Sequence, residues 1–77
     1  GMMGAGSDMA ALEQAESFDA EFIRQMIPHH QMGIMMAQMA RRSSGHAEIQ
    51  ELADDIIEGQ SAEIELMNDW YGEWYGN

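Results

Sequence analysis

Two segments of this chain carry apolar side chains at the spacing of an α-helix, and the stretch Ser43-Ser44-Gly45 separates them. At about 100° per residue, apolar positions in each segment fall on one continuous stripe. The first stripe consists of Phe22, Ile23, Met26, Ile27, His30, Gly33, Ile34, Ala37 and Ala40. The second consists of Ile49, Leu52, Ala53, Ile56, Ile57, Ile64, Met67, Trp70, Tyr71 and Trp74. The pattern predicts an all-α fold in which two long helices form an antiparallel hairpin.

Signals at the ends of these segments indicate where each helix begins. Ser17 is a suitable N-cap for a helix over residues 18–42, and acidic residues follow in its first turn. The second helix is expected to begin near Ala47 and to reach Trp70 or a little beyond. The pair Ser7-Asp8 predicts a cap for a short helical segment over residues 9–16.

Pro28 lies inside the first predicted helix, directly before the two adjacent histidines. Proline removes one backbone donor, so we expect a kink at this point. A break into two shorter helices is the alternative. The continuous apolar stripe favours the kink.

The length of 77 residues and the absence of cysteine limit how this fold can be stabilised. We expect residues 1–7 to be disordered or derived from a tag, and residues 8–77 to form a single helical domain. A domain this small buries only about 60% of its unfolded surface. One hairpin cannot enclose two apolar stripes, whereas two hairpins can do so as a four-helix bundle. The sequence therefore predicts either a homodimer or a fragment of a longer chain.

Fourteen acidic residues against three basic ones give a formal net charge of −11. Such a chain repels phosphate backbones and anionic headgroups, so we expect no nucleic-acid partner and no membrane association. No apolar run approaches the roughly 18 residues that a membrane span needs. No signal peptide is visible, but Gly1 before Met2 resembles a cloning remnant, which leaves room for a removed leader.

Residues 26–39 hold two of the three histidines and five of the nine methionines. Imidazole nitrogen and thioether sulfur are ligands for soft metals, above all Cu(I). On a helix, the side chains at i, i+3 and i+4 lie one above another. That spacing groups four residues, here called the methionine ridge: His29, Met32, Met36 and Met39. The pattern predicts a Cu(I) site from His29, Met32 and Met36, to which Met26, His30 and Met39 are further candidate ligands. The alternative is packing, because methionine fills irregular gaps at adaptable interfaces.

Three polar residues interrupt the apolar stripes: His30 on the first helix, and Gln60 and Glu63 on the second. Counting outward from Ser44 places His30 opposite Gln60, and Glu63 level with Met26. Because a buried polar group without a partner costs about 1–3 kcal/mol, we expect these side chains to satisfy one another in one buried layer. That layer either sets the register of the helices or forms a metal or proton site. A di-iron centre is poorly supported, since the chain lacks Glu-x-x-His motifs.

The spacing of these residues also resembles a known family. The block from Met26 to Gln31 reads Met-Ile-Pro-His-His-Gln, and Gln60, Glu63, Ile64, Met67 and Trp70 follow it at fixed intervals. In these residues the chain resembles the family catalogued as domain of unknown function 305. The resemblance implies a ferritin-like helical protein that is exported, periplasmic or secreted, and often associated with copper. Its copper ligands would come from Met26, His29, His30, Met32, Met35, Met36 and Met39. Many members look like two such hairpins in one chain, whereas this chain contains one.

These observations predict an extracytoplasmic protein that binds Cu(I) and sequesters it or hands it on to a copper-handling partner protein. The alternative is a structural helical module that dimerises, or binds a partner, without metal. We do not expect an enzyme, because the sequence contains no Ser/His/Asp set, no phosphate-binding loop and no complete metal-carboxylate motif.

Overall fold

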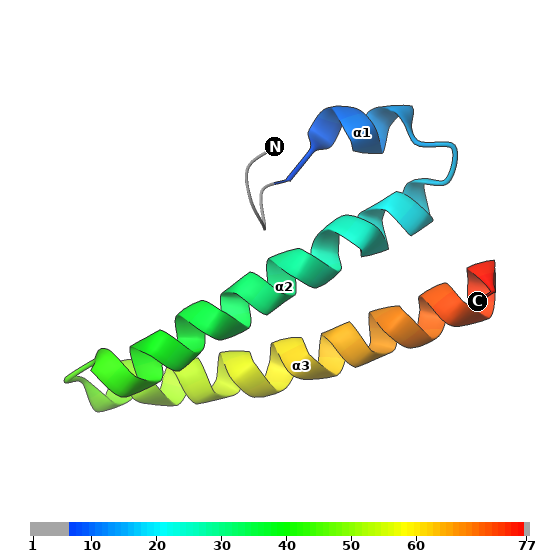
Figure 1. Ribbon diagram of the computed structural model, residues 1–77. Coiled ribbons are helices and arrows are strands. Elements are labelled where there is room, and N and C mark those ends of the chain that lie inside the picture. Colours follow the sequence, from blue (N-terminus) through cyan, green and yellow to red (C-terminus); the bar gives the residue numbers. More distant parts are fainter. Residues whose placement is uncertain (1–6, 77) are drawn as a thin grey trace.

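The computed structural model describes residues 7–76. In that part of the chain the secondary structure is entirely helical: α1 (Met9–Gln14), α2 (Phe18–Ser43) and α3 (Ala47–Tyr75). The helices α2 and α3 run antiparallel as a hairpin, and α1 folds back beside the first turns of α2 (Figure 1). The all-α prediction is confirmed. The segment expected to be disordered or tag-derived lies outside the described residues, apart from the exposed Ser7.

The helix α2 begins and ends with the expected signals. The Ser17 hydroxyl accepts a hydrogen bond from the Ala20 N–H at 3.2 Å and so caps the first turn. Arg41 and Arg42 stand in the last turn, where the helix dipole favours positive charge. Pro28 lies within this one continuous helix, so the alternative of two shorter helices is wrong. Proline cannot donate to the carbonyl four residues earlier, but the flanking turns keep their bonds.

Ser44, Gly45 and His46 connect the two long helices. The Ser44 hydroxyl accepts from the His46 N–H at 3.0 Å, and the Gln50 amide donates to the Ser44 carbonyl at 2.8 Å. Ser44 itself ends α2 in an extended conformation. The polar side chains of the turn thus satisfy backbone groups that the helix ends leave free.

The helix α3 continues to Tyr75, beyond the expected end near Trp70. Aromatic side chains four residues apart stack along this last part: the Trp70 and Trp74 ring centroids are 5.7 Å apart, and those of Tyr71 and Tyr75 are 5.0 Å apart. The Tyr75 and Ser17 hydroxyls lie 3.1 Å apart, which ties the end of α3 to the start of α2. These contacts outweigh the low helix propensity of the glycine among them.

The short helix α1 ends two residues earlier than expected, at Gln14. The Asp8 carboxylate caps it by accepting from the Ala11 N–H at 3.0 Å. Gln25 of α2 accepts from the Asp8 N–H at 2.8 Å and donates to the Asp8 carbonyl at 3.0 Å. This reciprocal pair holds α1 on α2, because a helix of six residues needs such contacts to persist.

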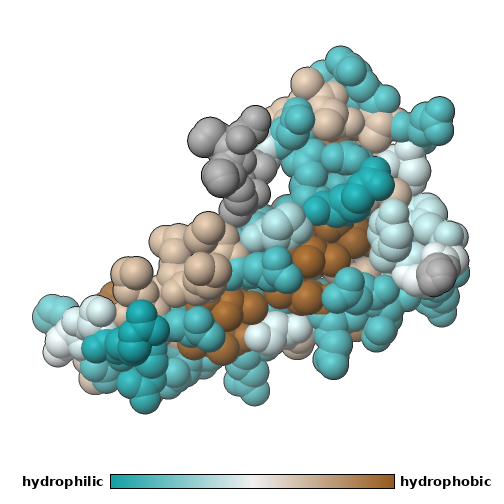
Figure 2. Space-filling model, in the orientation of Figure 1, coloured by the Kyte–Doolittle hydropathy of each residue, from teal (hydrophilic) through white to brown (hydrophobic). Residues whose placement is uncertain are grey.

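The hairpin buries few residues. The buried apolar set is Ala20, Ile23, Ala37, Ala53 and Met67, and no large side chain in the described part is less than 2% exposed. The molecule is 15 Å across its shortest axis, little more than the 10–12 Å of a single helix. Apolar surface reaches solvent along the line where α2 and α3 meet (Figure 2). Two helices in one layer therefore leave much of each apolar stripe uncovered.

Among the described residues, neither long helix has a stretch apolar and long enough to span a lipid bilayer.

Candidate metal-binding site

The methionine ridge lies on the outside of α2. His29 is exposed, and the exposed fractions of Met32, Met36 and Met39 are 38%, 67% and 59%. Because α2 is unbroken here, ridge neighbours three and four positions apart have Cβ atoms about 5–6 Å from one another. Methionine has three rotatable side-chain bonds, so adjacent thioethers can turn toward a common point.

The donor atoms of the ridge limit what it can hold. It offers one imidazole and three thioethers, a set that suits a soft monovalent ion such as Cu(I). Across residues 7–76, no three or more His, Cys, Asp or Glu side chains are grouped so that they could hold a metal ion. Zinc and hard cations depend on such groups. The donor set present therefore fits copper in its reduced state better than those ions.

Met35, Met26 and His30 do not belong to the ridge. Met35 is 60% exposed, about 100° around α2 from Met36. Met26 and His30 are half-buried and face the groove that α2 forms with α3. The structure thus separates the methionine-rich segment into an outward flank and an inward one.

His30 is bound to Glu63 across the hairpin. Its Nε2 lies 2.5 Å from the Glu63 carboxylate, and the two side chains are 12% and 61% exposed. A carboxylate accepts hydrogen bonds, so the contact places the ring proton on Nε2 and leaves a lone pair on Nδ1. That Nδ1 atom is buried and has no hydrogen-bond partner among the described residues. An acceptor in this state costs about 1–3 kcal/mol unless something binds it.

The polar residues of α2 and α3 pair differently from the pairing predicted by counting outward from Ser44. His30 meets Glu63 rather than Gln60, and Gln60 lies against Gly33 rather than His30. Side chains tilt toward the N-terminus of their own helix. In α2 this direction points away from the Ser44–His46 loop, and in α3 it points toward that loop. The α3 residue that meets a given α2 residue is therefore about one helical turn further from the loop than a symmetric count suggests.

The polar layer is also less closed than expected. Glu63 is mostly exposed, and Gln60 Oε1 is buried without a hydrogen-bond partner. His30, Gln60 and Glu63 therefore do not form one mutually satisfied buried layer: only His30 and Glu63 bond to each other.

Gly33 has a role that its place in the apolar stripe did not indicate. A Cβ atom added to Gly33 would lie 2.5 Å from Gln60 Oε1, so the missing side chain makes room for the amide of Gln60. A glycine inside a helix lowers the stability of that helix relative to alanine, so its presence often indicates that another group approaches closely. The sequence contained this indication, but it did not identify Gln60 as the group that approaches.

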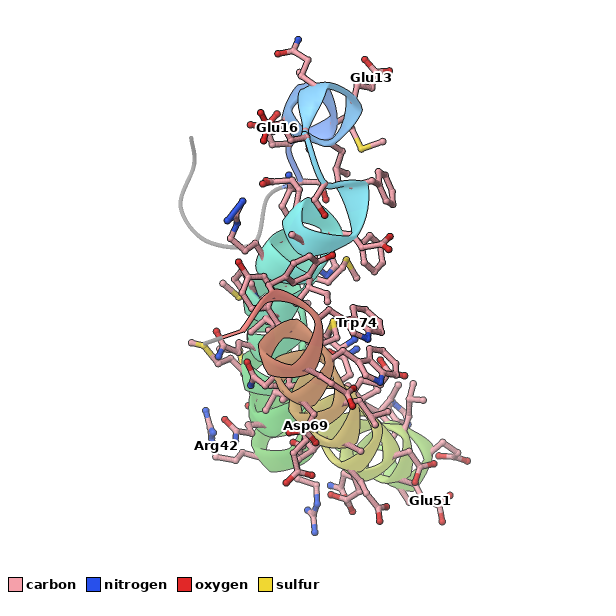
Figure 3. All side chains as sticks on the ribbon, turned by 90° about the vertical axis from the view of Figure 1, so that its right-hand side faces the viewer. Glu13, Glu16, Arg42, Glu51, Asp69 and Trp74 are labelled. Atoms are coloured by element: carbon pink, nitrogen blue, oxygen red, sulfur yellow. The ribbon has the colours of Figure 1, made fainter. Side chains whose placement is uncertain are left out.

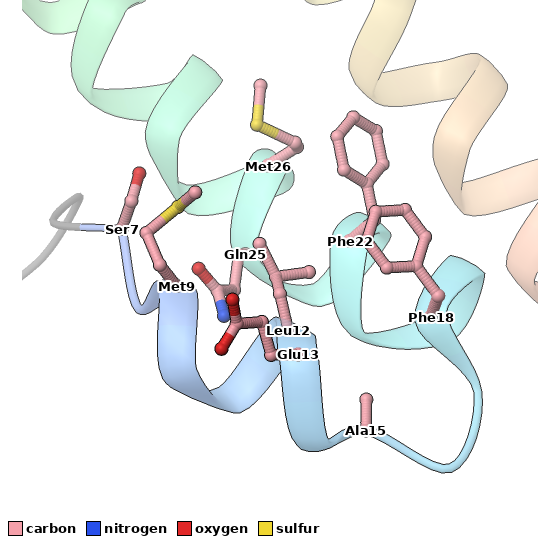
Figure 4. Close-up of a pocket in the computed structure, with 9 residues that line it drawn as sticks. All are labelled: Ser7, Met9, Leu12, Glu13, Ala15, Phe18, Phe22, Gln25 and Met26. Carbon is pink, nitrogen blue, oxygen red and sulfur yellow. The ribbon is translucent and has the colours of Figure 1, made fainter.

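Several open hollows lie beside α2, and three of them contain methionines of this helix. The largest, about 650 Å³, lies between α1 and α2 and is lined by Met9, Leu12, Phe22 and Met26 among others, but by no histidine (Figure 4). A hollow of about 260 Å³ near the turn includes Met36 and Gln60 in its lining.

The third hollow, about 410 Å³, lies between α2 and α3 and combines thioether, imidazole and carboxylate groups. Its lining consists of Phe22, Met26, His30, Glu63, Leu66, Met67 and Trp70. Trp70 stacks on Trp74, which lies on one flank of the hairpin, whereas Arg42 lies on the opposite flank (Figure 3). In the sequence, Met67 and Trp70 indicated packing alone, because they lie in the apolar stripe of α3.

Comparison with known families decides the relationship that the motif suggested. The sequence profile of the family described as "Domain of unknown function (DUF305)" matches residues 1–71. The chain belongs to this family. The DUF305 match covers both long helices up to Tyr71, and so includes the whole ridge and the His30–Glu63 pair.

A curated protein and several solved structures are similar to this chain. "Uncharacterized protein L153" of Acanthamoeba polyphaga mimivirus is 40% identical over 55 residues, which cover 71% of this chain and 36% of that protein. CopM in an Ag-bound form is 54% identical with a TM-score of 0.89, over 92% of this chain and 52% of that one. CopM in the Cu(I)-bound form is 54% identical with a TM-score of 0.88, over 92% and 51%. CopM has also been solved in a Cu(II)-bound form, with 52% identity and a TM-score of 0.89, over 92% and 48%.

This DUF305 chain spans about half the length of the CopM chains that it matches, and about a third of the mimivirus protein.

Proposed function

We propose that this chain binds Cu(I) at the methionine ridge and sequesters the ion or hands it on, without catalysing a reaction. One observation carries the proposal: a chain 54% identical to a Cu(I)-bound relative has an imidazole and three thioethers at helical spacing on an exposed flank. His29, Met32 and Met36 form the site in this proposal, and Met39 extends it by one further turn.

The exposure of the ridge supports transfer rather than permanent storage. Low-coordinate Cu(I) accepts thioether and imidazole ligands and exchanges them readily when another soft donor approaches. An incoming copper-handling protein can reach Met36, which is 67% exposed, without unfolding α2. The proposal therefore includes such a partner.

We further propose that the protein acts outside the cytoplasm, in the periplasm or as a secreted protein. The chain has no cysteine, so its soft donors are all thioethers and imidazoles. Thioethers do not form disulfides, which makes this donor set suitable for an oxidising compartment where thiolates would pair.

Anaerobic titration with Cu(I) or Ag(I), followed by competition with a chromophoric chelator, tests the ridge. We expect a variant combining His29→Ala with Met36→Ala to bind at least about tenfold more weakly, a difference of about 1.4 kcal/mol. Met9→Ala is the control, because Met9 is 68% exposed, close to the 67% of Met36, but lies on α1. Equal affinities of the double variant and the unaltered protein would contradict the proposal.

A structural role is the second candidate, and the uncovered apolar surface favours it. Phe22, Leu52, Leu66, Trp70 and Trp74 are each between 39% and 54% exposed. Two hairpins that pack these side chains together would form a ferritin-like four-helix bundle and bury both stripes. In this second proposal the protein is a homodimer or binds a helical partner, and the methionines only pack.

Native mass measurement with and without copper separates the two candidates. Met32→Leu and Met36→Leu conserve apolar volume, so a purely structural role predicts an unchanged assembly and no bound metal in any variant. Copper binding at the ridge predicts added metal mass in the unaltered protein and the loss of the mass of one copper ion per chain in both variants. Leu66→Glu places a charge on the uncovered surface and is expected to dissociate a dimer that depends on it.

A further inference from the structure

We propose a second soft-metal site between the helices, in which Met26 and His30 of α2 and Met67 of α3 bind one Cu(I) or Ag(I) ion beside Trp70. The inference rests on the proposed function for the class of metal, but none of its ligands belongs to the methionine ridge. Here it is called the groove site.

The three ligands line one hollow although they come from two helices. Met26, His30 and Met67 all border the space of about 410 Å³ between α2 and α3. Two thioethers and one imidazole form a three-coordinate set of soft and borderline donors, which Cu(I) accepts. The lining also includes a carboxylate, Glu63, but one of its oxygens already binds His30.

His30 is prepared for metal binding by its contact with Glu63. Histidines that bind metals almost always donate the other ring N–H to a carboxylate, a carbonyl or water, which sets the tautomer and orients the ring. Here Nε2 is bound to Glu63 at 2.5 Å, and Nδ1 is buried without a hydrogen-bond partner. A metal ion on Nδ1 would supply the missing partner, and Glu63 would act as the residue that positions the ring.

Trp70 supplies an aromatic wall to the same hollow. A cation over the face of an indole ring, within about 6 Å of its centroid, is attracted by the ring's negative face. Phe22 and Leu66 complete the apolar surroundings of the hollow, and two of the three ligand side chains are better covered than the ridge methionines: Met67 is 6% and His30 12% exposed. We infer that the groove site releases its ion more slowly than the exposed ridge does.

Tryptophan emission provides a local readout, because the chain has two tryptophans, Trp70 and Trp74. In a Trp74→Phe background only Trp70 remains, and Ag(I) can be titrated without redox chemistry. We expect Trp70 emission to change and to saturate at one ion per chain in the groove. Met67→Leu conserves volume at a residue that is 6% exposed. It should lower the Ag(I) affinity measured by Trp70 emission at least tenfold. Met36→Leu is the matched control on the ridge and should leave that response unchanged.

The His30 imidazole is the second readout, and it does not depend on a variant that must fold. In the unaltered protein, nitrogen NMR should show the Nδ1 resonance moving on addition of Ag(I) while Nε2 keeps its proton. The groove site is overturned if Met67→Leu responds with the affinity of its parent, or if His30 Nδ1 does not move. Those results leave the ridge untouched, since the effect expected of His29→Ala with Met36→Ala is the loss of one bound ion per chain, whereas the emission of Trp70 follows the groove ion alone. Conversely, a ridge that binds nothing would leave the emission response of Trp70 intact.

Discussion

Met36 and Met67 are the same residue type on the two long helices, yet their surroundings are opposite. Met36 is 67% exposed on the outer flank of α2, whereas Met67 is 6% exposed on the side of α3 that faces α2. Methionine is both a soft ligand and a flexible filler of apolar gaps. A high methionine content therefore indicates neither role by itself, and the environment of each side chain decides which kind of site it can join: an exposed site for Met36, a covered one for Met67.

The same contrast extends to the two sides of each helix. Toward the partner helix, small residues such as Ala37, Ala53 and Gly33 let the backbones approach, and every added atom is felt. On the outer flank, side chains contact little and can change without disturbing the fold. Paired substitutions, one on each side, test how sharp this division is.

The largest difference is expected for the two methionines themselves. Met67→Ala should lower the free energy of unfolding by about 2–4 kcal/mol, because it removes a buried side chain and leaves a cavity. Met36→Ala makes the same chemical change on the exposed flank and should stay within about 0.5 kcal/mol of the unaltered protein. Urea denaturation followed by far-UV circular dichroism measures both. Equal losses would show that Met36 is covered by something that a single hairpin does not contain.

Two glycines give a smaller contrast. Gly59 has nothing within 4 Å of an added Cβ atom, so Gly59→Ala should stabilise α3 by about 0.5–1 kcal/mol through a lower unfolded-state entropy. Gly33→Ala would bring its Cβ to 2.5 Å from Gln60 Oε1, so the amide end of the Gln60 side chain must move, and the cost of that movement should cancel much of the same gain. Thermal unfolding compares the two. A Gly33→Ala variant as stable as Gly59→Ala would mean that Gln60 does not rest on Gly33 in solution.

The smallest contrast concerns two glutamates of α3. Glu63→Ala removes the bond to His30, but Glu63 is 61% exposed, so we expect a loss of only about 0.5–1 kcal/mol. Glu65→Ala removes the same charge from the same helix at an exposed position with no such bond. The difference in free energy of unfolding between the two variants isolates the His30 contact. If Glu65→Ala costs as much as Glu63→Ala, the contact contributes nothing measurable.

Much of the helical architecture could be predicted from residue order. Ser17 and the acidic first turn mark the start of α2 through local chemistry, which acts over three or four residues and needs no partner. The errors lie where distant contacts outweigh local preference. The end of α3 at Tyr75 is an example, because Ser17 and the stacked aromatic rings hold a segment that its glycine weakens.

The candidate sites divide in the same way. The grouping of His29, Met32, Met36 and Met39 follows from the helical repeat, and an unbroken α2 is enough to place them on one flank. The pairing of His30 with Glu63 does not follow from any repeat, since a symmetric count around the turn ignores the opposite tilt of side chains in antiparallel helices. Met67 and Trp70 join His30 at one hollow for the same reason.

Periodicity alone was therefore sufficient to establish the helices, their apolar stripes and the set of soft donors on α2, because a helix face depends only on the spacing along one chain. The packing of α2 against α3 was needed to establish which turn meets which, which methionines face water, and which histidine nitrogen has no partner. Those properties depend on the direction of side chains across an interface, which residue order does not specify.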